Sequence, residues 1–168
     1  MKLSGKRIAA VFAVCLSASA ASAQLRPVPE RALTLAAQAC LGIPADPQAA
    51  RDLIVGRGWA AGEIKDGNGK ALENKGLAPY GRDGVLLLLT TDPGKAGCLL
   101  MADVKPSLKS ARAVAVVAAA LGVQPISTTS EGAMWTLPQG QAFMLRYARK
   151  GRGANVQMIV TPINGKTN

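Results

Sequence analysis

The sequence of 168 residues contains no histidine. Histidine is the usual general base of enzymes and the commonest zinc ligand. Its absence excludes serine and cysteine nucleophiles that are activated by histidine, and it leaves a zinc site without its most frequent ligand. The sequence therefore predicts no catalytic residue, no metal site and no cofactor.

Aromatic residues are also scarce, with two each of Trp, Tyr and Phe in the whole chain. Clefts that process sugars need aromatic platforms, so a glycosidase has little support. Two carboxylates can still meet in space, and the candidates are Asp52, Glu63, Asp66, Asp83, Asp92 and Glu131. A Ser/Lys pair among Ser107, Lys109 and Ser110 can be imagined, but the start of a surface helix explains these residues more simply. A small hydrolase that works without histidine is thus the alternative function.

The first 23 residues have the three parts of a secretory signal peptide. Lys2, Lys6 and Arg7 form a cationic start, and residues 8–21 carry no charge. This uncharged run is shorter than the roughly 20 apolar residues that span a bilayer, and residues 21–23 are the small residues that signal peptidase requires. We expect cleavage after Ala23 and one mature domain of residues 24–168 that is periplasmic or secreted and does not span a membrane.

Only two of the three cysteines, Cys40 and Cys98, remain after this cleavage. A pair of cysteines in an exported chain usually forms a disulfide. A redox pair normally has its two sulfurs within a few residues of each other, whereas these two are 58 positions apart. We therefore predict one structural disulfide, Cys40 to Cys98.

Hydrophobic periodicity predicts three helices and five strands. The first helix covers residues 30–41, and the second begins at Pro47 with Asp46 as N-cap and ends at Gly56 or Gly58. The third covers residues 105–121. The strands are expected at residues 85–91, 98–102, 133–137, 141–149 and 155–161. The order α-α-β-β-α-β-β-β predicts an α+β domain, with a largely antiparallel sheet of about five strands packed against two to three helices.

Two further expectations concern the first half of the chain. Residues 63–82 show no clear period and are predicted to be mostly loop. The four consecutive leucines at residues 86–89 predict a central strand that is covered on both faces.

Acidic residues are nearly absent from the second half. Loss of the signal peptide lowers the formal charge from +10 to +7, and eight basic residues after Asp103 face only Glu131. Four of them fall within seven positions, on a predicted strand and on the tip of the hairpin that follows it: Arg146, Arg149, Lys150 and Arg152. Cations gathered in this way attract phosphate and carboxylate groups.

The predicted function is therefore the binding of an anionic partner by an exported, non-catalytic domain. Outside the cytoplasm the partner is an anionic lipid, an anionic glycan or an acidic protein of the cell envelope, and nucleic acid is not expected. A simpler interpretation is that the cations keep the domain soluble and protect a sheet edge from pairing. A third is that the exposed strand pair forms an interface with another envelope protein.

Overall fold

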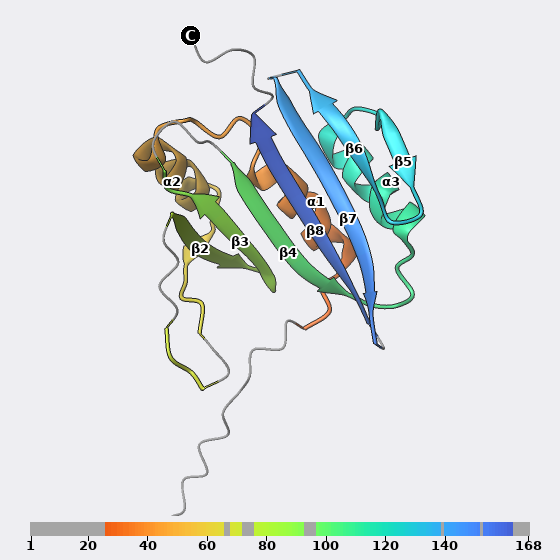
Figure 1. Cartoon of the computed structure of the whole chain (residues 1–168), viewed down its shortest axis with the longest axis horizontal. Helices are drawn as coiled ribbons and strands as arrows, with labels where there is room; N and C mark the ends of the chain where they lie inside the picture. Colours follow the sequence, from red (N-terminus) through yellow and green to blue (C-terminus); the bar gives the residue numbers. More distant parts are fainter. Residues whose placement is uncertain are drawn as a thin grey trace, which may run out of the picture.

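A computed structural model describes residues 26–65, 68–71, 76–92, 97–138, 140–151 and 153–162. These residues form three helices and one antiparallel sheet of eight strands (Figure 1). The predicted α+β class with helices packed against an antiparallel sheet is therefore confirmed. No helix in the described ranges is long and apolar enough to cross a membrane. The predicted signal peptide, residues 1–23, lies outside these ranges, so its cleavage stays a prediction.

The strands occur in the sheet in the order β1-β2-β3-β4-β8-β7-β6-β5. Their bounds are β1 Ala60–Ala61, β2 Leu77–Arg82, β3 Val85–Thr90, β4 Cys98–Val104, β5 Ser127–Thr129, β6 Gly132–Leu137, β7 Gln141–Lys150 and β8 Gly153–Pro162. The helices are α1 Glu30–Ala39, α2 Pro47–Gly56 and α3 Ser110–Leu121. After β4, helix α3 carries the chain to the far edge, and the last four strands return until β8 pairs with β4.

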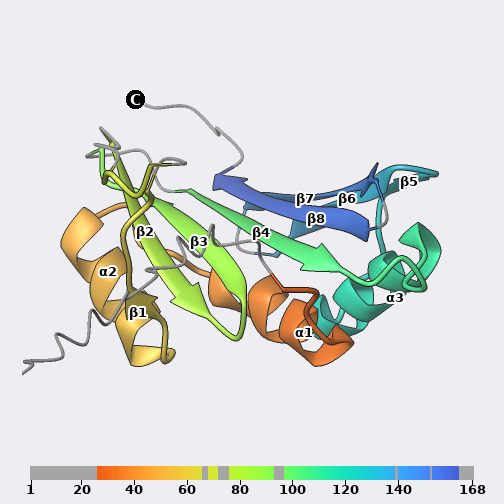
Figure 2. The same cartoon turned by 90° about the horizontal axis from the view of Figure 1, so that it is seen from below.

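All three helices lie on the same face of the sheet, which we call the covered face (Figure 2). Alternate residues of each strand point to it, as the two-residue period of a strand requires. On β4 the buried residues are Cys98, Leu100, Ala102 and Val104. The core between sheet and helices also holds Trp135 and Phe143, whose rings meet edge to face with centroids 5.5 Å apart.

The predicted disulfide is present and joins the end of α1 to the first residue of β4. The Cα atoms of Cys40 and Cys98 are 6.2 Å apart, and both residues are buried. The bond ties two segments that are 58 positions apart, so it links the first helix to the middle of the sheet.

The second helix is capped at its start and is joined to the first helix just beyond its end. The Asp46 carboxylate accepts a hydrogen bond of 2.7 Å from the Ala49 N–H, which confirms the predicted N-cap. Just beyond the other end, the Arg57 guanidinium donates to the carbonyl oxygens of Ala39 and Leu41, at 2.5 and 3.0 Å. These carbonyls lie at the end of α1, where helical partners run out. Burial of this guanidinium lowers the pKa of Arg57.

The strand count is larger than expected, because three strands were not predicted. Strand β2 lies within the segment that was expected to be mostly loop, and it pairs with β3 through a two-residue turn at Asp83 and Gly84. Both turn residues have positive φ, 49° and 82°, as a tight β-hairpin requires. Strands β1 and β5 have two and three residues, and each pairs with a single neighbour at an edge of the sheet.

The third helix begins at Ser110, five residues later than predicted. Residues 105–109 form a turn in which the Leu108 N–H donates to the Lys105 carbonyl at 2.9 Å. The Leu108 carbonyl in turn accepts a buried hydrogen bond of 2.7 Å from the Tyr147 hydroxyl. This contact comes from a strand 39 positions away, so periodicity alone did not reveal it.

Strand β3 pairs with a neighbour on each side, as expected of a central strand, but the described helices cover only one of its faces, contrary to the expectation. Strand β3 is third from one edge, and only Val85, Leu87 and Leu89 point to the covered face. Leu88 points to the opposite side, where no described helix lies (Figure 2). It is nevertheless only 7% exposed, because Pro79 and Leu99 flank it on the neighbouring strands. We call this opposite side the open face.

Candidate functional site

Two of the four cations predicted to bind an anion are described with their side chains, Arg146 and Arg149, and both are exposed on β7. Lys150 ends this strand and pairs with Gly153 across a two-residue hairpin, as expected, but its side chain is outside the description. Arg152 also lies outside the described residues. The prediction for these two positions therefore rests on the sequence alone.

Arg146 and Arg149 line the same shallow hollow, of about 620 Å³. The hollow lies over the ends of β7 and β8 and beside the turn between β5 and β6. The other residues that line it are Ser130, Glu131, Tyr147, Ala148, Asn155 and Gln157. Its donors are thus two guanidinium groups accompanied by amide side chains.

The register of the sheet opens space beside Arg146. This residue lies directly between Gly132 on β6 and Gln157 on β8. Gly132 has a positive φ of 155°, and a Cβ atom added there would overlap the carbonyl oxygen of Leu145. Because a side chain cannot be accommodated opposite Arg146, its guanidinium is not covered from that strand. The sequence analysis missed Gly132 and Gln157, whose importance follows from strand register.

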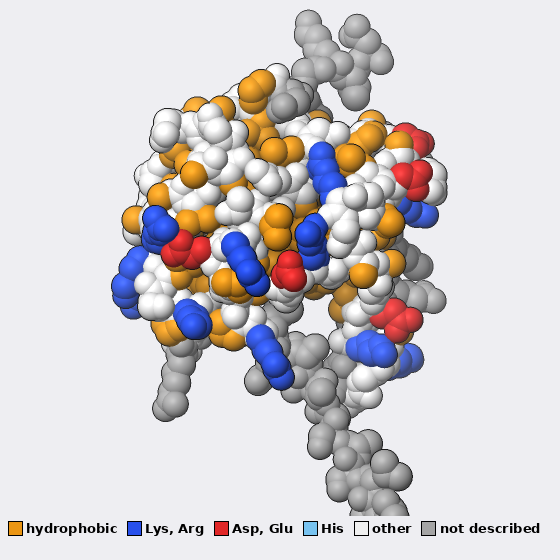
Figure 3. All heavy atoms as spheres, turned by 180° about the vertical axis from the view of Figure 1, so that it is seen from behind, with side chains coloured by type: hydrophobic (Ala, Val, Ile, Leu, Met, Phe, Trp, Pro, Cys, Tyr) orange, Lys and Arg blue, Asp and Glu red, His pale blue; other side chains and the backbone are white. Residues whose placement is uncertain are grey.

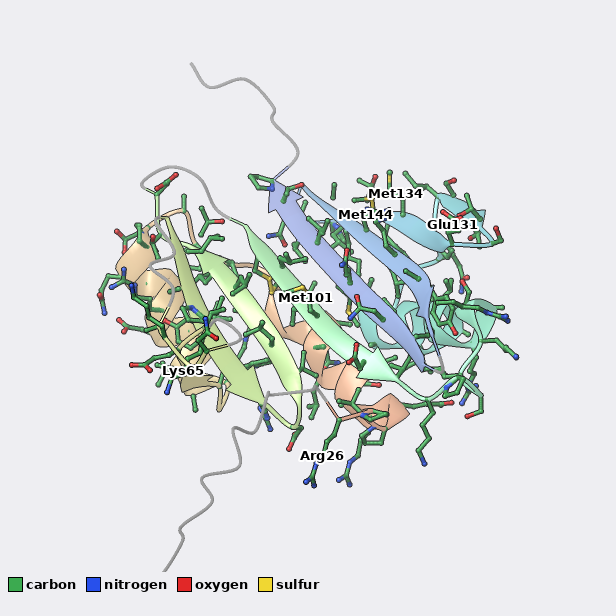
Figure 4. All side chains as sticks on the ribbon, turned by 60° about the horizontal axis from the view of Figure 1, so that its bottom comes forward. Arg26, Lys65, Met101, Glu131, Met134 and Met144 are labelled. Carbon is green, nitrogen blue, oxygen red and sulfur yellow. A yellow bond between two sulfur atoms is a disulfide. The ribbon has the colours of Figure 1, made fainter. Side chains whose placement is uncertain are left out.

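The turn between β5 and β6 forms the rim of the hollow. The Thr129 hydroxyl accepts a hydrogen bond of 3.2 Å from the Glu131 N–H, and the Glu131 carbonyl accepts one of 2.6 Å from the Tyr147 N–H. These contacts fix the turn against β7. Glu131 lies at the right-hand end of the sheet in Figure 4. Its carboxylate lines the hollow, and its negative charge would repel an anion bound there.

The donors of Arg146 and Arg149 differ from those of Arg57, Arg82 and Arg112, which bind other residues. Within the described part of the chain, neither forms an ion pair or a side-chain hydrogen bond. Arg112, by contrast, is held by Glu30 through two short contacts, of 2.8 and 3.1 Å to one carboxylate oxygen. This hydrogen bonding lowers the pKa of Glu30 and raises that of Arg112. The two guanidiniums of the hollow therefore have donors available for phosphate or carboxylate.

Among the described residues, those of the hydrolase alternative do not come together in the hollows that Ser107 and Glu131 line. Ser107 lines a hollow of about 350 Å³ with Lys105, but Lys109 and Ser110 do not line it. The Ser110 hydroxyl is buried and has no hydrogen-bond partner in the described structure. Of the candidate carboxylates, Glu131 lines the anion hollow without a second acidic residue, and Asp66 is outside the described residues. Among the described residues, no group of three His, Cys, Asp or Glu is placed to hold a metal ion.

Comparisons of this chain with protein-family models, with curated proteins and with solved structures found no match. The functional assignment therefore rests on the residues of this chain and their geometry.

Proposed function

We propose that this protein is an exported, non-catalytic binding protein that holds an anionic component of the cell envelope at Arg146 and Arg149. One observation carries the proposal: two exposed guanidiniums without partners among the described residues line one hollow, beside a glycine that leaves Arg146 uncovered.

The chemistry of the hollow suits an oxyanion. A guanidinium presents several N–H donors in a plane and matches the oxygens of phosphate or carboxylate in a bidentate manner. Gln157 lies directly opposite Arg146 and adds an amide donor to the same surface. The positive surplus of the second half, to which Lys150 and Arg152 contribute, attracts anions over longer distances.

The disulfide supports the proposed location. Such bonds persist in oxidising compartments and are rare in the cytosol. The buried pair of Cys40 and Cys98 is therefore compatible with a periplasmic or secreted protein. An envelope component with phosphate or carboxylate groups is then the available class of partner.

A charge-reversal pair tests the proposal. The variant Arg146→Glu with Arg149→Glu should bind soluble polyphosphate at least about tenfold more weakly per arginine, since a hydrogen bond to a charged group contributes about 1.5–3 kcal/mol. The matched control is Arg31→Glu with Arg51→Glu, which changes the net charge equally on exposed positions of α1 and α2. Basic and acidic side chains are interspersed on this helical side (Figure 3). Equal losses in both variants, measured by titration at constant salt, would show that net charge alone attracts the anion.

A second substitution tests the sign of the charge that is bound. Glu131→Gln removes the carboxylate at the rim of the hollow and should tighten polyphosphate binding, because a nearby negative charge repels an anion. The effect should weaken as salt rises. Weaker binding in Glu131→Gln would mean that the hollow uses Glu131 to hold a cation, and the proposal would be wrong.

A further inference from the structure

The open face of the sheet carries six apolar residues in a continuous line across six strands. In the antiparallel register each residue is directly opposite the next: Pro79, Leu88, Leu99, Ile159, Met144 and Met134. We call these six residues the apolar row. Leu86 and Met101 extend it on β3 and β4, since they too are paired on this face.

This face differs from the outer face of an ordinary one-sided sheet, which is polar. Met134 is 42% exposed, and Leu99, Ile159 and Met144 are half-buried. Within the described residues, the helices all pack on the other side of the sheet (Figure 2). Met101, Met144 and Met134 are labelled on β4, β7 and β6 in Figure 4. A continuous apolar stretch of this kind, partly exposed at most of its positions, is typical of an interaction site.

The apolar row lies beside the anion hollow. Arg146 follows Met144 by two residues on β7, so both side chains are on the same face, and Gln157 is related to Ile159 in the same way. A smaller hollow of about 200 Å³ is lined by Met134, Met144 and Arg146 together. The acidic Asp103 of this face accepts a hydrogen bond of 3.0 Å from Asn155. The surface thus combines apolar side chains with cations at one end.

These features decide between partners. A second copy of the chain matches the apolar row but brings a second positive charge of +7 after the expected cleavage, which repels the first. A soluble anionic glycan matches the arginines but has no apolar groups to cover the row. An anionic membrane offers phosphates to the cation and acyl chains to the apolar row, because its phosphates lie above its acyl chains. The central strands are paired on both sides, so their backbone N–H and C=O groups stay hydrogen-bonded when this face moves from water into the membrane.

We infer that the open face docks on an anionic lipid membrane, with the apolar row between the head groups and with Arg146, at the open-face end of the row, on a lipid phosphate. This inference rests on the proposed function and identifies its partner. Apolar burial and attraction to anionic lipids act together in such interfacial binding. Binding should therefore require anionic lipid, and high salt should weaken it without abolishing it, because salt does not screen the apolar contacts.

The test compares the two halves of this surface in one assay. Co-sedimentation with vesicles of phosphatidylglycerol and phosphatidylcholine should show about a tenfold loss of affinity for Ile159→Thr combined with Met144→Thr, because two apolar side chains are lost from the contact. Thr is tolerated in strands, and circular dichroism checks folding. Met134→Thr, at the most exposed position of the row, is the second variant. Val55→Thr is the control, since Val55 is 55% exposed on α2.

The outcomes separate this inference from the proposed function. If both hold, the apolar variants lose vesicle binding and keep polyphosphate binding, while Arg146→Glu with Arg149→Glu loses both. If the apolar variants bind vesicles as the unchanged chain does, while the arginine variant loses polyphosphate, the membrane inference is wrong and the anion site stands. If the arginine variant keeps both ligands, the proposed function fails as well. A dimer in analytical ultracentrifugation that Ile159→Thr dissociates would assign the face to a second copy and overturn the membrane inference.

Discussion

The two faces of the sheet are built from alternate residues of the same strands, yet they have different compositions. On β4, Leu100 of the covered face is 1% exposed, whereas the adjacent Leu99 is half-buried on the open face. The covered face holds the disulfide, the aromatic pair and the helices. The open face has the apolar row and, at its β7 end, the cationic hollow. Neighbouring positions of one strand therefore separate residues that stabilise the fold from residues that we propose to bind a partner.

The largest expected effect is on the covered face, at the disulfide. Replacing Cys40 and Cys98 together by Ala should lower the free energy of unfolding by about 4 kcal/mol, because a closed loop of 58 residues restricts the unfolded chain. Urea denaturation of the oxidised parent and the double variant measures this difference. Below its unfolding transition the variant should still bind polyphosphate. Unchanged stability would mean that the bond does not hold α1 to the sheet.

The next prediction compares adjacent residues of β4. Leu100→Ala should destabilise the protein by about 3 kcal/mol, as is usual for a buried leucine that leaves a cavity. Leu99→Ala should cost about 1 kcal/mol, because its side chain is partly in water already. Urea midpoints of the two variants give the comparison directly. Equal losses would indicate that the open face is covered as closely as the helical one.

A smaller loss of stability is expected at the turn that forms the rim of the hollow. Gly132→Ala places a methyl group against the Leu145 carbonyl and should cost about 2 kcal/mol, since the backbone must move. The turn with Glu131 should shift with it, so polyphosphate affinity should also fall. Gly140→Ala is the control: Gly140 also has a positive φ, but a Cβ atom there meets nothing within 4 Å. A wild-type affinity in a folded Gly132→Ala protein would show that this turn does not shape the hollow.

The smallest effect is expected at the exposed pair of Glu30 and Arg112 on the helical side. Hydrogen bonding to Arg112 holds the pKa of Glu30 below its ordinary value of 4.5 in the folded protein. The stabilisation is therefore complete above pH 4.5 and is lost as the pH falls through the lower folded pKa. Glu30→Gln should be slightly less stable than the parent at pH 7, and the difference should shrink as the pH falls below 4.5. A difference that widens in acid would contradict this sign.

Much of the covered face could be predicted from the sequence, because it depends on local periodicity. The strand predicted at residues 141–149 is β7, in which the buried Phe143, Leu145 and Tyr147 alternate with Met144 and Arg146. The cap at Asp46 and the disulfide also followed from residue type and spacing. Strand β2 was missed because Pro79 and Gly81 interrupt its pattern, although the Asp83-Gly84 pair after it is a strong hairpin signal.

The open face could be predicted only in part, because it depends on contacts between distant strands. Arg146 and Arg149 were visible as a charge cluster, but Gly132 and Gln157 gained their role from the register of β6 and β8 against β7. Recognising the apolar row would require knowing the pairing register of six strands at once. In the sequence its members are scattered between residues 79 and 159, with no common period.

The most direct test of the difference between the faces uses the methionine methyl groups. Of the four methionines after residue 23, Met101, Met134 and Met144 are on the open face, and Met158 is 1% exposed on the covered face. In NMR spectra of methyl-labelled protein with anionic vesicles that carry a paramagnetic lipid, the account predicts broadening of the first three signals and an unchanged Met158 signal. Broadening of all four alike, or of none, would contradict it.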